Sequence, residues 1–315
     1  MKCIICNQEK EDDELSIEHV IPESAGSSFT INCVCKECNN RLGQTIDKKF
    51  LDNKLVKFYL YSYDIKNKKG RFPKFWNTLP AKDNPKIKAI PQYNSRNNKF
   101  EGWKYKSVLS NNNNGNMELI FDSSEDIEDV LKEFDLPDEV LEEIINKHNS
   151  GDYVRKNHKL DLRYGSSRED LFFEAIKIAY EYAYYIFGDE YLLDSFASEF
   201  REILLNPNKF SINEIKKYFI NYDFGESKFK NTLHDLNMIR FENSIVVNIN
   251  LFDCFNFCVE VSKNLNLFPP DIIVSFLLIG KDTNFDEYNI DVNFMDIDFF
   301  KRFKDIEVKD NIFKY

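Results

Sequence analysis

Two Cys-x-x-Cys pairs within the first forty residues constrain the fold of this chain more than any other feature. The pairs are Cys3 with Cys6 and Cys35 with Cys38, and 28 residues separate the inner two cysteines. Each pair brings two sulfurs to one side of a tight turn, and two such turns facing each other form the tetrahedral set that Zn2+ accepts at about 2.3 Å. Four thiolates leave no position for water. We therefore expect a structural zinc ion that contributes to folding.

A disulfide framework is the alternative interpretation of these cysteines. Seven cysteines is an odd number, however, and the opening Met-Lys-Cys-Ile-Ile-Cys is too short and too soon interrupted by charge to be an apolar export segment. Reduced thiols and the lack of a leader favour zinc and a cytoplasmic location. Cys33 could replace Cys35 as a ligand, but its spacing to Cys38 makes a poorer turn, so we interpret Cys33 as a small buried thiol.

The segment between the cysteine pairs contains Glu18-His19, followed by Val-Ile-Pro and Gly26, with Asn32 before the second pair and Asn39 directly after it. This ordered set resembles the HNH endonucleases of the ββα-metal class. It is closest to the branch whose C-x-x-C pairs bind zinc and whose final motif reads C-x-x-C-N followed by a Gly and an Asp. The resemblance covers residues 1–50 and implies a β-hairpin that carries Glu18-His19, then a helix that carries Asn39.

Carried over by position, the resemblance makes His19 the general base that draws a proton from water. Glu18 and Asn39 would hold a catalytic cation, and Asn32 would steady the loop and the base. Oxygen ligands favour Mg2+ or Mn2+ for this ion, and an imidazole with a pKa near 6.5 suits proton abstraction around pH 7. Asn39 stands where many relatives have His, and Glu18 where many have Asp. The alternative for His19 is a histidine packed under a zinc turn without a catalytic role.

The formal net charge of −11 is unevenly distributed along the 315 residues. Residues 1–54 carry −3, residues 55–110 carry +10, and the remainder carries −18. The basic stretch also contains both tryptophans, and basic side chains interleaved with aromatic ones are typical of nucleic-acid surfaces. The alternative, that these rings form a core, is compatible with a basic outer face. We expect DNA contacts from Lys86, Lys88, Arg96, Lys99, Lys104 and Lys106.

Hydrophobic patterning predicts a mixture of helices and antiparallel strands. Residues 56–63 alternate like a half-buried strand, and residues 93–106 predict a β-hairpin. Helices are expected over 137–150, 167–187 and 189–205, and strands over 245–261 and 272–279. The phrase Lys177-Ile-Ala-Tyr-Glu-Tyr also resembles the region downstream of the nuclease in the zinc-bearing HNH branch, without fixing a function. No stretch of eighteen apolar residues occurs, so we expect no membrane span.

These observations predict an α+β fold in three parts. They are a zinc-stapled ββα nuclease module at 1–54, a basic β-rich extension at 55–122, and an acidic domain of helices and antiparallel strands at 123–315. The predicted function is metal-dependent hydrolysis of DNA phosphodiester bonds, and the resemblance adds phage defence, restriction or a mobile element as the setting. Two other functions remain open. One is a zinc module that binds nucleic acid without cutting it, and the other is a nuclease gated by its acidic part, a regulatory partner or homo-oligomerisation.

Overall fold

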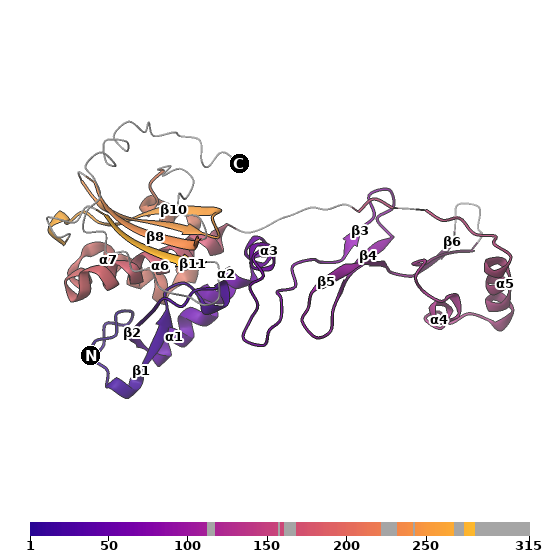
Figure 1. Ribbon diagram of the computed structural model, residues 1–315, viewed down its shortest axis with the longest axis horizontal. Coiled ribbons are helices and arrows are strands. Elements are labelled where there is room, and N and C mark those ends of the chain that lie inside the picture. The colour runs from indigo at the N-terminus through magenta and orange to yellow at the C-terminus, as the bar shows by residue number, and fades with distance from the viewer. Residues whose placement is uncertain are drawn as a thin grey trace. The chain divides into compact units, whose positions relative to one another are not determined.

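The computed structural model describes residues 1–111, 117–156, 158–160, 168–221, 232–241, 243–267 and 274–280. The chain forms two compact units (Figure 1). One contains Met1–Lys66 and the described residues of Ser166–Tyr315, and the other is Asn67–Gly165. The expected α+β class is confirmed, because helices and several antiparallel sheets occur. The two units group the chain differently from the three expected parts, since much of the acidic C-terminal part shares a unit with the first 66 residues.

The first 66 residues form a β-hairpin followed by a run of helices. Strand β1 pairs with strand β2 in antiparallel fashion, with an irregularity in register next to Ile17. The order of hairpin and helix is the one that the resemblance implied. The elements are η1 (Asp12–Glu14), β1 (Leu15–His19), η2 (Glu23–Ala25), β2 (Thr30–Cys35), α1 (Lys36–Leu42), the π-helical segment η3 (Gly43–Asp47), α2 (Lys48–Asp52) and α3 (Lys54–Ser62).

Residues 56–63, which were expected to form a strand, belong largely to helix α3, so that prediction was wrong. Asn53 begins the helix, and its side-chain oxygen accepts a hydrogen bond from the Leu55 N–H. Val56 and Leu60 lie one turn apart and are both buried. The apparent alternation arose because large rings also occupy the outer side of the helix, where Phe58 is exposed.

The C-terminal part of the same unit contains a four-stranded antiparallel sheet of order β10-β9-β8-β11. The helix expected over 167–187 and the strands expected over 245–261 and 272–279 are confirmed where they fall on described residues, and β8 was not predicted. The single helix expected over 189–205 is instead a 3-10 helix followed by an α-helix, because Asp194 is extended and caps the second one. The helical elements are α6 (Glu169–Phe187), η4 (Gly188–Leu193), α7 (Ser195–Leu205), η5 (Pro207–Lys209), α8 (Ile212–Ile215), η6 (Lys216–Tyr218) and η7 (Leu265–Leu267). The strands are β8 (Thr232–Arg240), β9 (Ile245–Leu251), β10 (Phe255–Ser262) and β11 (Val274–Gly280).

Helix α6 is the central layer of this unit. It contacts β9 and β10 on one side, and α2 and η3 on the other (Figure 1). Its buried side chains share one hydrophobic core with the hairpin and with the sheet. The hairpin and helix of the first fifty residues are therefore part of a larger body whose centre is supplied by a helix from the second half of the chain.

The described residues of the second unit, Asn67–Gly165, form short antiparallel sheets and two helices. The expected hairpin is present, because β4 pairs with β5 around a bend that includes Asn98, but its first strand covers 88–93 and so lies before the predicted start at residue 93. The rings of Trp76, Phe100 and Trp103 pack with centroids 5.5 to 6.0 Å apart, so part of the aromatic content forms a small core. The elements are β3 (Leu79–Pro80), β4 (Lys88–Tyr93), β5 (Phe100–Tyr105), β6 (Val108–Asn111), β7 (Met117–Ile120), α4 (Ile127–Leu131) and α5 (Asp138–Asn149).

Candidate functional site

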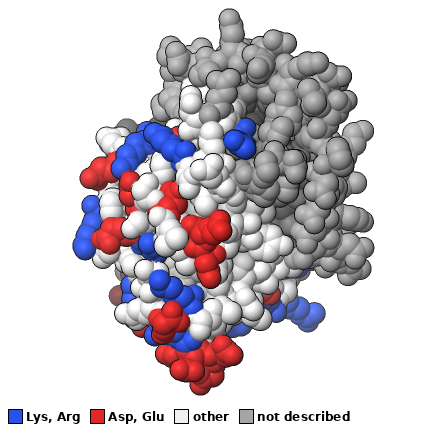
Figure 2. All heavy atoms as spheres, turned by 90° about the vertical axis from the view of Figure 1, so that its left-hand side faces the viewer, with Lys and Arg blue, Asp and Glu red and all other residues white. Residues whose placement is uncertain are grey.

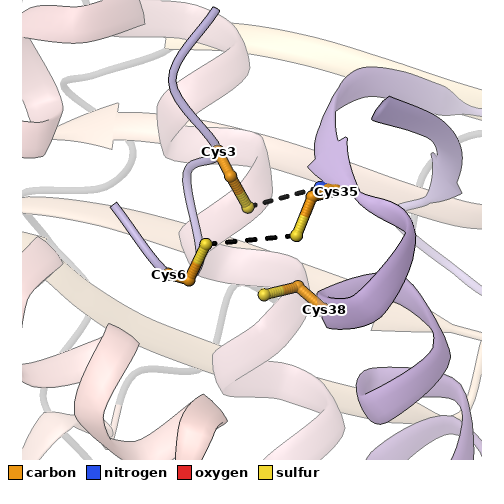
Figure 3. A group of neighbouring side chains, drawn as sticks. All are labelled: Cys3, Cys6, Cys35 and Cys38. Carbon is orange, nitrogen blue, oxygen red and sulfur yellow. Dashed lines mark hydrogen bonds between the residues drawn. The ribbon is translucent and has the colours of Figure 1, made fainter. Parts of the chain in front are cut away.

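The four cysteines of the two C-x-x-C pairs lie together, as the sequence predicted (Figure 3). Their Sγ atoms are all within 4.8 Å of one another, and those of Cys6 and Cys35 are 4.0 Å apart. Cys35 ends strand β2 and Cys38 lies in helix α1. Sulfurs bound tetrahedrally to one zinc ion are about 3.8 Å apart, so this donor set fits a metal ion. Among the described residues, it is the one group of three or more Cys, His, Asp or Glu side chains that could hold such an ion.

The contacts among the cysteines stabilise the thiolate of Cys3, and thiolate is the form that binds metal. A hydrogen bond with the Cys38 side chain lowers the pKa of Cys3 to about 4, against the effect of burial, and the same bond raises the pKa of Cys38. The backbone N–H of Cys35 also donates to Cys3 Sγ at 3.3 Å. Cys33 lies outside this group and is buried, and burial raises its pKa to about 12.

Glu18 and His19 end strand β1 in two different environments. The Glu18 side chain is 2% exposed, whereas the His19 side chain is 31% exposed. The imidazole Nε2 lies 3.7 Å from Oε2 of Glu23, in the turn that follows the strand. The imidazole is thus partly open to solvent in polar surroundings, which a group that activates water requires.

Asn39 lies in helix α1 and is tied to strand β1. Its Nδ2 donates to the Ile17 carbonyl oxygen at 2.7 Å and to Ser16 Oγ at 3.2 Å. Because the amide nitrogen makes these bonds, the carbonyl oxygen Oδ1 is the atom with which Asn39 can coordinate a cation. Ile17 directly precedes Glu18, so Asn39 is tied to the backbone of the strand that carries Glu18. Asn32 is exposed on β2, where the register shifts.

Helix α6 carries a fully buried lysine, Lys177, that contacts the end of strand β1. Lys177 Nζ lies 2.7 Å from Glu18 Oε1 and 3.0 Å from Asp47 Oδ1. It also donates a hydrogen bond to the His19 carbonyl oxygen at 2.8 Å. One ammonium group therefore contacts both members of the Glu18-His19 dipeptide and the last residue of η3.

Two further carboxyl groups of α6 surround this lysine. Glu174 and Glu181 are fully buried, and Glu181 Oε2 lies 3.9 Å from Lys177 Nζ. Burial raises the pKa of both well above the ordinary value. Burial alone would lower the pKa of Lys177, but the carboxylates around it outweigh burial and raise that pKa well above its ordinary value. Burial also raises the pKa of Glu18, against the effect of the nearby Lys177. Since unpaired buried charge is costly, we infer that Lys177 is charged and that Glu174 and Glu181 are neutral.

No role at the site was predicted for Asp47, Glu174, Lys177 and Glu181, although Lys177 and Glu181 belong to the phrase that resembles the region downstream of the nuclease. Glu174, Lys177 and Glu181 were detectable, because they recur at spacings of three and four residues within a helix that is otherwise apolar. That spacing places them on one face of the helix. A charged stripe on a buried helix indicates polar partners on the element packed against it, but it does not say which element that is.

The six basic residues expected to contact DNA lie in the second unit. Five are exposed, and Lys104 is half-buried in an ion pair with Glu125 at 2.5 Å. Strands β4 and β5 pair, which places Lys88 and Lys104 in the same sheet. Figure 2 shows a different face, on the side of the first unit, where the basic and acidic side chains of the described residues are intermingled. The five exposed residues are Lys86, Lys88, Arg96, Lys99 and Lys106.

Among the described helices, none has the length and apolar character needed to cross a membrane.

Comparison with known proteins identifies the N-terminal segment. Residues 3–55 match the family model described as HNH endonuclease. No curated protein and no solved structure shows significant similarity to the chain. The matched segment contains the cysteine group, the Glu18-His19 dipeptide and Asn39, in the hairpin and helix order described above. Residues 3–55 of this chain are therefore similar to the HNH endonuclease family.

Proposed function

We propose that this protein hydrolyses DNA phosphodiester bonds in a reaction that requires a divalent cation. The observation that carries the proposal is the hairpin and helix of the HNH segment. There, Glu18 and His19 end strand β1, and Asn39 is hydrogen-bonded to the backbone of the same strand at Ile17. An acid, an imidazole and an amide are the groups needed to bind a hard cation and to move a proton.

Each residue has a distinct task in the proposed reaction. His19, with its partly exposed imidazole, takes a proton from the attacking water. Glu18 and the Oδ1 of Asn39 would hold Mg2+ or Mn2+, and Asn32 would steady the strand beside them. When bound, this cation stabilises the charge on the phosphate and on the departing 3′ oxygen. The expected products carry 5′ phosphate and 3′ hydroxyl ends.

The cysteine group has a structural task in this proposal. We assign it to Zn2+, because four thiolates at these separations match a closed tetrahedral site. Such a site would fix the turn carrying Cys3 and Cys6 to the end of β2 and the start of α1. The hairpin that presents Glu18 and His19 is then closed at its base by metal.

The exposed basic residues of the second unit support the choice of DNA as substrate. Lysine and arginine side chains on a sheet surface neutralise phosphates without reading sequence. We propose that Lys86, Lys88, Arg96, Lys99 and Lys106 contact the DNA backbone, with Lys104 contributing less because it already pairs with Glu125. A cytoplasmic role in phage defence, restriction or a mobile element is the setting we propose, and it rests on the family alone.

The test is cleavage of plasmid DNA by the full chain, with Mg2+ or Mn2+ and with a weak chelator that leaves zinc in place. His19→Ala should lower the cleavage rate by about 10²- to 10⁴-fold, because the general base is lost. His148→Ala, which removes an imidazole from helix α5 of the other unit, is the matched control and should cleave like the wild type. A folded, zinc-loaded His19→Ala protein that cleaves at the wild-type rate would reject the assignment. DNA binding with no cation-dependent cleavage by the wild type would favour the non-cleaving module instead.

A further inference from the structure

Helix α6 holds the Glu18-His19 dipeptide through a single ammonium group. We propose that Lys177 is a positioning residue of the nuclease site, which fixes the Glu18 carboxylate and the His19 backbone for the reaction. The inference rests on the proposed function, because fixing these two residues matters to catalysis only if they carry it out. It assigns a part of the site to a residue 122 positions beyond the end of the matched HNH segment.

The two contacts of Lys177 with the dipeptide act on different parts of it. The contact at 2.7 Å with Glu18 Oε1 orients the carboxylate, which still has a second oxygen with which to coordinate a cation. The hydrogen bond at 2.8 Å to the His19 carbonyl oxygen fixes the main chain from which the imidazole projects. Because Lys177 is fully buried, the surrounding side chains restrict the position of its ammonium group. A proton-transfer group displaced by about 1 Å can lose a hundredfold in rate.

Asp47 extends this arrangement to the helix that carries the other proposed ligand. Its Oδ1 lies 3.0 Å from Lys177 Nζ, and Asp47 ends η3, the π-helical segment that continues helix α1. Asn39 lies in α1. Lys177 therefore contacts the strand with Glu18 and the helical run with Asn39 at the same time. It joins the two elements between which the proposed cation would bind.

A simpler role for Lys177 would be to balance the charge of the buried acids. The two roles predict different results for a variant that lacks the Lys177 ammonium group but has the same net charge around Glu18 as the wild type. Lys177→Met removes the positive charge and keeps most of the side-chain volume. Lys177→Met with Asp47→Asn also removes one of the paired carboxylates, so that the net charge beside Glu18 returns to the wild-type value. The contacts to Glu18 and to the His19 carbonyl remain absent in both variants.

The experiment compares the full-length wild type, both variants and the control Ile178→Ala. Ile178 is buried in α6 next to Lys177, so its truncation lowers stability without removing a contact to the dipeptide. Four quantities are measured for each: bound zinc, thermal melting, Mn2+ affinity by electron paramagnetic resonance, and DNA cleavage per folded molecule. We expect both Lys177 variants to lose about 10- to 100-fold in Mn2+ affinity or cleavage, as is typical when a partner of a metal ligand is removed. Ile178→Ala should melt earlier and cleave normally.

Each outcome decides between the roles. If the double variant binds Mn2+ and cleaves like the wild type, Lys177 only balances charge and the proposal is wrong. If neither Lys177 variant folds, Lys177 is a stability residue and the proposal is equally wrong. Failure of the proposed function has a different signature, namely a wild type that does not cleave or a His19→Ala variant that cleaves equally well. An inactive His19→Ala beside a fully active double variant would overturn the positioning role alone.

Discussion

The stability of the first unit should depend on pH because the unit contains a buried histidine. His234 lies in β8 with no exposed surface, and its Nε2 is hydrogen-bonded to the Ala25 carbonyl oxygen at 2.9 Å. Its Nδ1 accepts a hydrogen bond from the Phe252 N–H at 3.4 Å. The neutral imidazole satisfies both bonds. A second ring proton would point at the Phe252 N–H, so protonation breaks the arrangement.

The magnitude follows from the pKa of His234. Burial lowers this pKa from 6.5 to about 4, opposed by the bond to Ala25. In the unfolded chain the imidazole takes up a proton near pH 6.5, whereas in the folded protein it resists protonation until about pH 4. The stabilisation is therefore complete above pH 6.5 and is lost as the pH falls through this window. At about 1.36 kcal/mol per pKa unit the full loss is about 3 kcal/mol, of which about 2 kcal/mol is gone by pH 5.

The assay must report on the unit that contains His234. Both tryptophans, Trp76 and Trp103, lie in the other unit, so tryptophan fluorescence would follow the wrong transition. Amide hydrogen exchange of β8 and β9, corrected for intrinsic rates at each pH, gives the local free energy of opening. His234→Gln serves as the reference, because its amide can donate to Ala25 but does not titrate.

Acidic side chains also titrate between pH 7 and pH 4, but their contribution to the free energy of opening is the same in both proteins and is removed when the two curves are subtracted. The wild type should lose about 2 kcal/mol more than His234→Gln between pH 7 and pH 5, since only the wild type carries the imidazole. Parallel curves for the two proteins over this range would show that His234 is not held neutral by the fold, and would refute the reasoning.

Two further predictions concern the metal and the DNA. Cys38→Ser should lower the bound zinc well below one ion per chain and destabilise the hairpin, whereas Cys33→Ala, at a buried thiol outside the cysteine group, should keep the ion. Elemental analysis measures the zinc content of the two variants, and thermal melting measures their stability. Equal loss of zinc from both variants would mean that the ligands are wrongly assigned. Lys88→Ala should reduce the slope of log affinity against log salt by about one, while Lys104→Ala should reduce it less, because Lys104 already pairs with Glu125. Fluorescence anisotropy with a duplex oligonucleotide over a series of salt concentrations measures the slopes, and unchanged slopes for Lys88→Ala would remove it from the proposed surface.

The features of the site that the sequence predicted well are local ones. The C-x-x-C spacing brings each pair of sulfurs together within one turn, so only the meeting of two turns had to be inferred for Cys3, Cys6, Cys35 and Cys38. The hairpin of β4 and β5 was likewise predictable from alternation around a polar bend. Helix α3 was misread because Val56 and Leu60 fit both a two-residue and a four-residue period in so short a segment.

The contact between Lys177 and the HNH segment was not predictable in this way, because Lys177 lies 158 positions after His19 in the chain. Charged residues on an apolar helix indicate a buried polar face, but only the packing of α6 against η3 shows that this face meets Glu18 and Asp47. A buried lysine paired with two carboxylates costs free energy, because charged groups are removed from water. Packed apolar side chains could replace these groups if they served stability alone. The cost is consistent with a role in holding Glu18 and His19 in place. On that argument, the unit that must fold before the proposed nuclease site is complete includes helix α6 as well as the matched segment at 3–55.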